Sequence, residues 1–254
     1  MVERMLLLTD LDRTVLYSHR HAADGEKIWV EALNGHPQSF VTETTYRFFR
    51  TQDWLDVVPV TTRTKPQFDR LRGALAAFGW RDTLICNGSI LLRDGVEDTA
   101  WTEGSVRISE ASRPDYERAR EFAAGLAGKD AVVSADPFLF YIKTDRAETV
   151  FNALSAHTDP AKLTVLRDSR KVYCFPQALN KGRAAERYRR RAGHEAYLAA
   201  GDSEFDIPML QNAAVGFCPE SLAHYEAKGE VRVCGGLFSD GLCDGLEKIR
   251  NEGL

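Results

Sequence analysis

Short apolar runs alternate with amphipathic segments near both ends of the chain. The runs at residues 5–10, 57–61 and 83–86 predict buried strands, because each is short and bounded by polar or turn-forming residues. After residue 180 the alternation returns, and it predicts helix 181–192, strand 197–200, helix 205–212, strand 214–217, a helix near 220–228, strand 231–234 and helix 240–251. Strands and helices in this order are typical of an α/β protein with a doubly wound parallel sheet.

Local signals define the elements between the first strands. Residues 26–33 and 38–41 flank Asn34-Gly35, which predicts a β-hairpin. Residues 44–52 are predicted to be helical. A second helix is expected to start at Thr64, because a proline lies in its first turn and a glutamine three residues after the cap.

The middle of the chain, residues 90–176, has a different pattern. Strand-like runs at 105–108, 131–134, 138–143, 163–166 and 172–175 surround two predicted helices, 113–127 and 146–157. The two adjacent runs 131–134 and 138–143 are separated only by turn residues, which implies antiparallel pairing. We therefore expect an α+β cap at residues 90–176, inserted into an α/β core formed by residues 1–89 and 177–254.

Composition narrows the classes of partner. The 254 residues are 44% hydrophobic and carry a net charge of −4, which argues against nucleic acid or a membrane surface as the main partner. No stretch approaches the roughly 20 apolar residues of a membrane span. The five cysteines lack CxxC spacing, as expected in a reducing compartment. Met1 to Arg4 lead into an apolar run too short for a signal peptide. We expect a cytoplasmic monomer or small homo-oligomer.

Two acids mark the end of the first apolar run. Asp10 and Asp12 are one residue apart, and Thr14 follows. Carboxylates at close range resist joint ionisation unless a cation joins them. A divalent metal would remove this conflict and leave one carboxylate free to act as a nucleophile. The alternative is an ordinary solvated turn, and the pair alone does not decide between the two.

Chemically active residues also follow three later boundaries between elements. These are Thr61-Thr62-Arg63 after strand 57–61, Lys181 at the start of a helix, and Gly201 to Asp206 after strand 197–200. Each alone is explained by helix capping or by the helix dipole. The carboxyl ends of parallel strands gather ligands, however, so the set in this order indicates one shared site.

The segments resemble the motifs of the haloacid dehalogenase-like (HAD) hydrolases. The similar branch has a large cap between the second and third motifs and includes Cof-type sugar phosphatases, sucrose-phosphate phosphatase and mannosyl-phosphoglycerate phosphatases. Asp10 to Thr14 resembles DxDxT, Thr61-Thr62-Arg63 resembles Thr-Gly-Arg, Lys181 resembles the third-motif lysine, Gly201 to Asp206 resembles GDxxxD, and Asn87-Gly88-Ser89 resembles an Asn-Gly-Ala motif.

The chain departs from these motifs at several positions. Arg13 and Thr62 replace glycines, and Phe205 stands where the Cof branch usually has asparagine. Cys218-Pro219-Glu220 replaces a common Gly-Asn-Ala. These departures put membership of the Cof group proper in question, whereas the nucleophile and metal positions are intact.

The resemblance implies a role for each motif residue. Asp10 would attack phosphorus to form an aspartyl-phosphate, and Asp12 would act as general acid and base. Mg²⁺ would be bound by Asp10, the main-chain carbonyl of Asp12 and Asp202, a set of oxygen ligands that suits a hard cation. Asp206 would support the metal through water. Thr61 and Lys181 would hold the phosphoryl oxygens.

Candidate substrate contacts are less sharply defined. Backbone N–H groups after Asp10, beginning with Leu11, are expected to assist phosphate binding. Thr62 could replace Thr61 in that role, and Arg63 is either a substrate contact or a structural salt bridge. Asn87 is a candidate substrate contact, although an Asn-Gly turn also explains it. The further candidates are Lys143, Arg167 and Arg170 in the cap for leaving-group selection, with surface charge as the alternative, and His19 to His21 for a transition metal, with a solvated loop favoured.

These expectations lead to one main hypothesis and several alternatives. The main hypothesis is a Mg²⁺-dependent phosphatase acting on a small soluble phosphomonoester, a sugar or polyol phosphate. A phosphomutase of the same cap class is the related alternative. A regulatory binding module without turnover is favoured by Arg13, Thr62 and Phe205, whereas a dehalogenase would leave Asp12 and Asp202 no metal to serve. The resemblance also places the predicted hairpin as a flap over the site, where Trp29 would shield the substrate or pack on its own hairpin.

Overall fold

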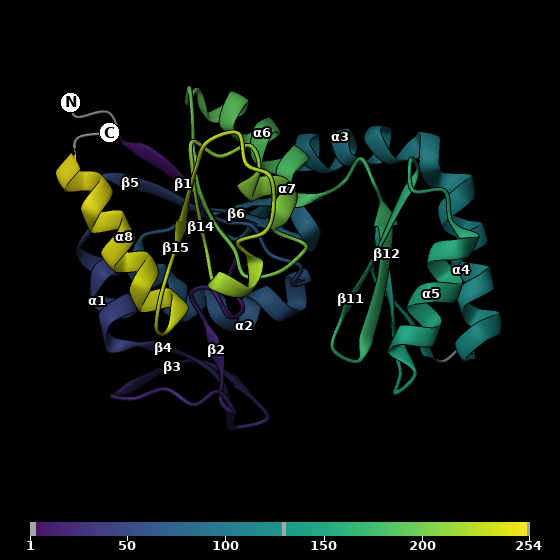
Figure 1. The fold of residues 1–254 in the computed structure, drawn as a ribbon, viewed down its shortest axis with the longest axis horizontal. Coiled ribbons are helices and arrows are strands. Elements are labelled where there is room, and N and C mark those ends of the chain that lie inside the picture. The colour runs from purple at the N-terminus through teal and green to yellow at the C-terminus, as the bar shows by residue number, and fades with distance from the viewer. Residues whose placement is uncertain (1–3, 129–130, 253–254) are drawn as a thin grey trace.

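A parallel sheet forms the centre of the larger part of the molecule (Figure 1). The computed structural model describes residues 4–128 and 131–252. Met1 to Glu3, part of the segment expected not to form a signal peptide, lie outside the described residues. The strand order is β15-β14-β13-β1-β5. The strands are β1 (Met5–Thr9), β5 (Leu55–Pro59), β13 (Leu198–Ala200), β14 (Val215–Cys218) and β15 (Glu230–Val233). The predicted doubly wound sheet is confirmed.

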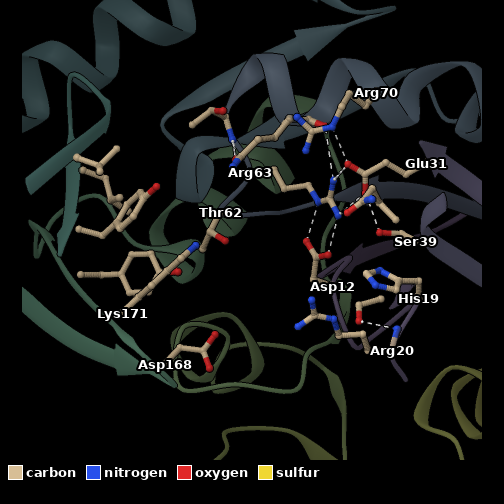
Figure 2. A pocket seen from close by; sticks show the side chains of 18 of the residues that line it. Asp12, His19, Arg20, Glu31, Ser39, Thr62, Arg63, Arg70, Asp168 and Lys171 are labelled. Carbon is tan, nitrogen blue, oxygen red and sulfur yellow. Dashed lines mark hydrogen bonds and ion pairs between the residues drawn. The ribbon is translucent and has the colours of Figure 1, made fainter. Parts of the chain in front are cut away.

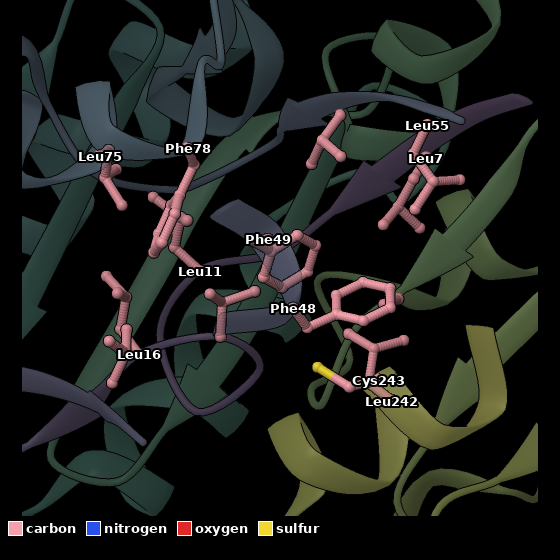
Figure 3. Packing of buried hydrophobic residues seen from close by; sticks show 14 of the residues in the cluster. Leu7, Leu11, Leu16, Phe48, Phe49, Leu55, Leu75, Phe78, Leu242 and Cys243 are labelled. Atoms are coloured by element: carbon pink, nitrogen blue, oxygen red, sulfur yellow. The ribbon is translucent and has the colours of Figure 1, made fainter. Parts of the chain in front are cut away.

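Both faces of this sheet are buried, as the continuous apolar run of β1 predicts. Leu7 packs with α1 (Glu43–Thr51), α2 (Lys65–Leu75) and α8 (Phe238–Glu252) in the cluster of Figure 3. Leu6 and Leu8 pack on the opposite face, against α6 (Lys181–Ala192) and α7 (Ile207–Leu210). Each buried leucine contributes roughly 1.5–3 kcal/mol relative to exposure, so the two clusters fix the position of β1 and of the acids that follow it.

A small antiparallel sheet lies at the base of the core in Figure 1. It consists of β2 (Tyr17–Ser18), β3 (Lys27–Leu33) and β4 (His36–Thr42), and we call it the hairpin sheet. Asn34 and Gly35 both have positive φ, 51° and 78°, as an Asn-Gly hairpin turn requires. The predicted hairpin is confirmed. Trp29 packs edge-on against Phe40 of the same hairpin, with ring centroids 5.7 Å apart.

The strand predicted at residues 83–86 has different neighbours from those expected. It is β6 (Asp82–Ile85), which pairs antiparallel with β7 (Ile90–Arg93), and β7 pairs with β8 (Val96–Glu97). A single bridge between Val60 and Leu84 joins it to the end of β5. The predicted strand therefore exists and lies parallel to the end of β5. Its antiparallel partner β7 was not predicted, because hydrophobicity indicates that a strand exists and not which strand it pairs with.

Residues 105–108 belong to α3 (Thr99–Ser109), so the strand predicted there is wrong. The carboxylate of Asp98 caps this helix by accepting a hydrogen bond from the backbone N–H of Trp101 at 3.0 Å. Val106 and Ile108 are exposed, so the alternation that suggested a strand has no buried face behind it. Trp101 packs in the same cluster as the core strands. α3 thus packs on the core through Trp101, and the cap boundary at residue 90 stays a prediction.

The second part of the molecule is a four-stranded antiparallel sheet with two helices, which we call the cap. Its strands are β9 (Val132–Asp136), β10 (Leu139–Lys143), β11 (Leu163–Asp168) and β12 (Lys171–Pro176), and its helices are α4 (Arg113–Ala127) and α5 (Ala147–His157). One sheet face, including Phe140 and Val172, is buried under these helices. The opposite face is turned toward the core in Figure 1. Both predicted helices and the antiparallel pairing are confirmed.

The last predicted helix before β15 is wrong. Only Glu220–Leu222 forms a short 3₁₀ turn. The N–H of Lys228 donates to the carbonyl of Gln211 at 3.0 Å, just before the chain enters β15. Among the described residues, no helix has both the length and the apolar character needed to cross a membrane.

Candidate active site

Three buried charged side chains form the floor of the site, at the carboxyl ends of the core strands. Asp10 follows β1, Lys181 opens α6 and Asp206 precedes α7. The Nζ atom of Lys181 lies 2.5 Å from Asp10 Oδ1 and 2.6 Å from Asp206 Oδ1. Lys181 is 1% exposed and Asp206 is fully buried. Burial costs several kcal/mol per ion, and mutual pairing offsets this cost only with good geometry, which these contacts provide.

Two glycines permit this close approach. A Cβ atom on Gly182 would lie 2.1 Å from the carbonyl oxygen of Pro208, so only glycine allows α6 to pack this closely on α7. A Cβ atom on Gly201 would lie 2.3 Å from the Cβ of Asp206. Asn180 starts α6 by accepting a hydrogen bond from the N–H of Arg183 at 2.9 Å. Asn180, at the start of α6, and the two glycines together place the Lys181 ammonium between the carboxylates of Asp10 and Asp206.

Asp206 organises the loop that carries Asp202. Its Oδ2 accepts hydrogen bonds from the N–H of Asp202 at 3.1 Å and from the N–H and hydroxyl of Ser203 at 3.0 and 2.8 Å. Its Oδ1 accepts from Lys181. Both oxygens of the Asp206 carboxylate therefore accept hydrogen bonds from protein groups, which suits the predicted role of supporting a metal through water.

The acids at this edge carry more negative charge than nearby cations neutralise. Asp10, Asp202 and Asp206 each offer an oxygen within 4.8 Å of the others, the one such metal-ligand cluster among the residues described. Burial raises the pKa of Asp10 well above its ordinary range, and neighbouring carboxylates add to this while Lys181 opposes it. Burial, reinforced by Asp206, raises the pKa of Asp202 to about 7. An oxygen-only acidic cluster of this kind fits a hard divalent cation.

Lys181 stays protonated in this setting. Burial alone would lower its pKa, but Asp10 and Asp206 outweigh burial and raise it. The ammonium therefore acts as a fixed positive charge at the floor of the site and has no role as a base.

Asp12 points away from the floor and is held by an arginine. Arg63 donates to both carboxylate oxygens of Asp12, from Nε and from a terminal nitrogen, each at 2.7 Å. The same guanidinium donates to Glu31 of β3 at 3.0 and 3.1 Å (Figure 2). Glu31 also accepts from Arg70 at 2.8 Å and from Ser39 at 2.7 Å. Of the two readings for Arg63, the structure supports the ion pair.

Glu31 is a site residue that the sequence analysis missed. Its side chain is only 3% exposed. Burial would raise its pKa, but hydrogen bonds from Arg63 and Ser39 outweigh burial and lower it. The strand register shifts on both sides of Glu31, so simple alternation along β3 does not reveal which face the side chain takes. The pairing of charges with Arg63 depends on tertiary structure.

Arg13 and Phe205, two departures from the family motifs, contact the cap. Arg13 has a φ of 66°, a conformation that favours glycine. Its Nε lies 2.8 Å from Asp202, and a terminal nitrogen lies 3.3 Å from Asp168 at the end of β11. The ring of Phe205 packs on Tyr173, with centroids 5.0 Å apart. Both unusual residues therefore join the core to this particular cap.

A cavity of about 720 Å³ opens beside Asp12, between the core, the hairpin sheet and the cap. Thr62 and Arg63 line its core side. His19 and Arg20 line it from the hairpin side (Figure 2), and neither is in the acidic cluster that could bind a metal. Its cap side is formed by Leu139, Tyr141, Asp168, Lys171 and Tyr173, together with Val133 and Ser134.

The cap cations proposed from the sequence do not line this cavity. Lys143 and Arg167 are exposed, and Arg170 is paired with Asp145 at 2.5 Å. The lysine that does line it is Lys171, which the predicted strand 172–175 omits by one residue. Selection of the leaving group by the three predicted cations is therefore without structural support.

The remaining predicted residues lie deeper in the protein. The hydroxyl of Thr61 is buried and accepts from the N–H of Arg63 at 3.2 Å. Leu11 packs in the core, so only its backbone could face a phosphate. Asn87 is buried, donates to the carbonyl of Leu179 at 3.1 Å and does not line the cavity. Its predicted substrate contact stays untested, and an interior structural role explains the contact it makes.

Comparisons with known proteins identify the fold. No family model matches the chain, and no curated protein does. Among solved structures, the sucrose-phosphatase from Synechocystis sp. PCC6803, in complex with sucrose and phosphate, is 16% identical over 98% of each chain, with a TM-score of 0.59. A sugar phosphatase of HAD subclass IIB is 13% identical, covering 97% of this chain and 99% of its own, with a TM-score of 0.63.

A further similar structure has the same overall organisation. Trehalose-6-phosphate phosphatase from Aspergillus fumigatus is 13% identical, covers 98% of this chain and 93% of its own, and has a TM-score of 0.55. At this identity the likeness establishes the fold. The chain has the haloacid dehalogenase-like fold of the capped phosphatases, as the order of its motifs predicts.

Proposed function

We propose that this protein is a Mg²⁺-dependent phosphatase that hydrolyses a small phosphomonoester, a sugar or polyol phosphate, through an aspartyl-phosphate on Asp10. The observation that carries the proposal is the buried Asp10–Lys181–Asp206 group with Asp202 beside it. Buried charges of both signs are concentrated there, as is typical of functional sites. The similar structures are phosphatases of sucrose phosphate, trehalose 6-phosphate and other sugars, which supports the substrate class.

In this proposal Asp10 is the nucleophile. One of its carboxylate oxygens forms a bond to phosphorus while the bond from phosphorus to the ester oxygen breaks. Lys181 neutralises charge on the phosphoryl oxygens and reduces their repulsion from Asp10, which is the main catalytic requirement in phosphoryl transfer. Asp206 fixes the Lys181 ammonium through the 2.6 Å contact and so acts as a positioning residue.

Asp12 is proposed to move the protons. It donates a proton to the leaving ester oxygen, then accepts one from the water that attacks the phosphorus of the aspartyl-phosphate. This returns Asp10 to a free carboxylate and releases inorganic phosphate. Such acid–base assistance typically contributes ~10²–10⁴-fold. Arg63 donates to both oxygens of Asp12 at 2.7 Å and holds it at the cavity wall, where the leaving group would lie. One of these two contacts has to open for Asp12 to carry the proton that it donates.

The acidic cluster fits Mg²⁺, which when bound would neutralise charge on the transferring phosphoryl group. Asp10, Asp202 and the main-chain carbonyl of Asp12 would hold it. Asp206 would keep the Asp202 loop in place through its hydrogen bonds to Asp202 and Ser203. A cytosolic location remains part of the proposal, supported by the five buried cysteines, none of which is in a disulfide.

Hydrolysis of p-nitrophenyl phosphate tests the proposal. We expect turnover that requires Mg²⁺ and is abolished by a chelator. Asp10→Asn should lower turnover by at least about 10³-fold because it removes the nucleophile. Asp69→Asn, the same chemical change at an exposed position on α2, is the matched control and should retain wild-type turnover.

Two results would contradict the proposal. If the wild type is as inert as Asp10→Asn across a panel of phosphate esters with Mg²⁺, the fold serves binding alone. If the phosphoryl group is recovered on a second sugar position and no phosphate is released, the protein is a phosphomutase. In the first case no labelled phosphoenzyme forms, and in the second it forms and returns its group to the sugar.

A further inference from the structure

Lys171 reaches from the cap into the cavity beside Asp12. It is the first residue of β12 and shares a sheet face with Tyr173 and, across the strand pair, with Tyr141. Its Nζ lies 4.7 Å from the centre of the Tyr141 ring and 5.9 Å from that of Tyr173. Figure 2 shows the side chain extending toward Thr62 on the core. The ammonium is thus held at the cavity wall by aromatic contacts on the cap.

This cation has no carboxylate partner among the ion pairs of the described residues. The acid directly opposite on β11 is Asp168, whose carboxylate pairs with Arg13 at 3.3 Å. The residue directly opposite on β10 is Lys143, a like charge, which is a destabilising arrangement for cross-strand neighbours. Burial lowers the pKa of Lys171, and Lys143 lowers it further. Asp168 and Asp12 act in the opposite direction. No carboxylate of the described residues forms an ion pair with the Lys171 ammonium, however, so it can contact a ligand in the cavity.

The other cavity cations near Asp12 are already engaged. Arg63 pairs with Asp12 and Glu31, and Arg70 pairs with Glu31. On the opposite wall, Arg20 forms no ion pair among the residues that the structure describes. Of the lysines and arginines that line the cavity, Lys171 on the cap side and Arg20 on the hairpin side are therefore the two without an ion pair among the described residues.

Lys171 also lies on the same cavity as a residue proposed to act in the reaction. Lys171 and Asp12, the proposed proton donor to the leaving oxygen, line the same cavity. A cavity of about 720 Å³ is within the range of small-molecule sites and exceeds what a phosphoryl group alone requires. The space between Asp12 and Lys171 is accordingly where the leaving group of the substrate would lie.

We propose that Lys171 binds a second anionic group on the leaving part of the substrate, a carboxylate or a further phosphate, so that the substrate is a phosphorylated acid or a bisphosphate. This inference rests on the proposed phosphatase function and narrows its substrate class. A Lys171 that only packs on the tyrosines, or that donates to neutral hydroxyls, would give no preference for charge.

Matched pairs of phosphate esters test the inference. The carboxylate arm compares 6-phosphogluconate with glucitol 6-phosphate, which differ by a carboxylate in place of a hydroxymethyl group. The phosphate arm compares fructose 1,6-bisphosphate with fructose 6-phosphate. For each compound kcat/KM is measured by phosphate release, and its inhibition of p-nitrophenyl phosphate hydrolysis is measured in parallel. We expect the anionic member of at least one pair to be favoured by about tenfold or more. The preference should weaken as salt is added.

Substitutions at paired lysines identify the responsible cation. Lys171→Met should reduce the preference to about one, and Lys171→Arg should retain most of it. Lys143→Met is the matched control, because it removes the same charge from the same sheet face at a position that does not line the cavity. Each ratio is taken within one enzyme preparation, so a partly folded variant lowers both members of the pair equally and leaves the ratio intact.

The outcomes separate this inference from the proposed function. Hydrolysis of p-nitrophenyl phosphate with no preference in either pair, by turnover or by inhibition, overturns the role of Lys171 and leaves the phosphatase in place. A preference that survives Lys171→Met, or that Lys143→Met removes equally, also overturns it. Absence of all phosphate release rejects the phosphatase and this inference with it.

Discussion

The buried floor of the site and the cap side of the cavity, which we call the roof, are built on opposite principles. On the floor, Lys181 and Asp206 are almost completely buried, and each charge is satisfied by protein groups at short distances. On the roof, Lys171 lies half-buried against aromatic rings, and Asp168 forms a longer contact to a half-exposed Arg13. Buried charges are costly to leave unpaired, so the floor must be rigid, whereas the roof can change its residues at little cost.

This contrast explains which part carries which task. Phosphoryl transfer needs the same charges for every ester, and such charges work best when preorganised in a dry site. The leaving group differs between substrates, and in our proposal side chains on one face of the cap sheet bind it. The departures Arg13 and Phe205 lie at the junction, where the buried floor meets the roof.

The largest effect is expected from removing the central charge of the floor. Lys181→Met leaves Asp10 and Asp206 buried without their cation, so activity should fall by at least about 10³-fold and the free energy of unfolding by about 3–5 kcal/mol. p-Nitrophenyl phosphate turnover and urea unfolding measure the two losses. Lys65→Met, at an exposed ion pair on α2, should change neither. Wild-type stability of the Lys181 variant would mean that the floor is not a coupled charge group.

A smaller effect is expected where the floor meets the cavity wall. Arg63→Lys keeps the charge but loses the double contact to Asp12, which positions the proposed acid. We expect kcat to fall about 10–100-fold with little change in KM, because the substrate contacts remain. Arg81→Lys, at an exposed bidentate pair with Asp94, is the matched control. A rise in KM with unchanged kcat would instead place Arg63 in substrate binding.

Loosening the junction should affect binding more than chemistry. Phe205→Ala removes the packing on Tyr173 and Phe175 and is expected to cost about 3 kcal/mol in unfolding free energy. KM should rise several-fold because the roof is less well placed, while kcat at saturation changes less. Phe122→Ala, on a partly buried ring packed within the cap, serves as control for loss of aromatic area alone. Equal KM values for both variants would show that the junction does not position the roof.

The smallest effect concerns pH and the cap strand β9. Burial raises the pKa of Asp136 to about 6, above its value of roughly 4 in the unfolded chain. Between these values the folded state holds a proton that the unfolded state lacks. Stability from this group is therefore fully present below the unfolded pKa of about 4 and is lost as pH rises from there through 6. Asp136→Asn should remove about 1–2 kcal/mol of this pH dependence, measured by urea unfolding at pH 4.5 and 7.5. Parallel curves for both proteins would refute the assignment.

The sequence predicted the floor well because its parts are local. Asp10 and Lys181 each follow a short-range signal, a buried strand that ends or a helix that begins, and the strand-end rule brings them together. The roof depended on pairing and register. Lys171 lies one residue before the strand that hydrophobicity outlined, and Glu31 lies at a register shift. Neither position shows its partner in the sequence, so neither was among the predicted site residues.

Trapping the phosphoenzyme tests the central claim most directly. Purified protein with Mg²⁺ and a slowly released phosphate ester is quenched in acid during turnover, and its mass and peptides are compared with those of Asp10→Asn. The account predicts one phosphoryl group on the peptide that contains Asp10, formed and lost at the rate of turnover and absent from the variant. Phosphate release without any such adduct, or an adduct on another residue, would contradict it.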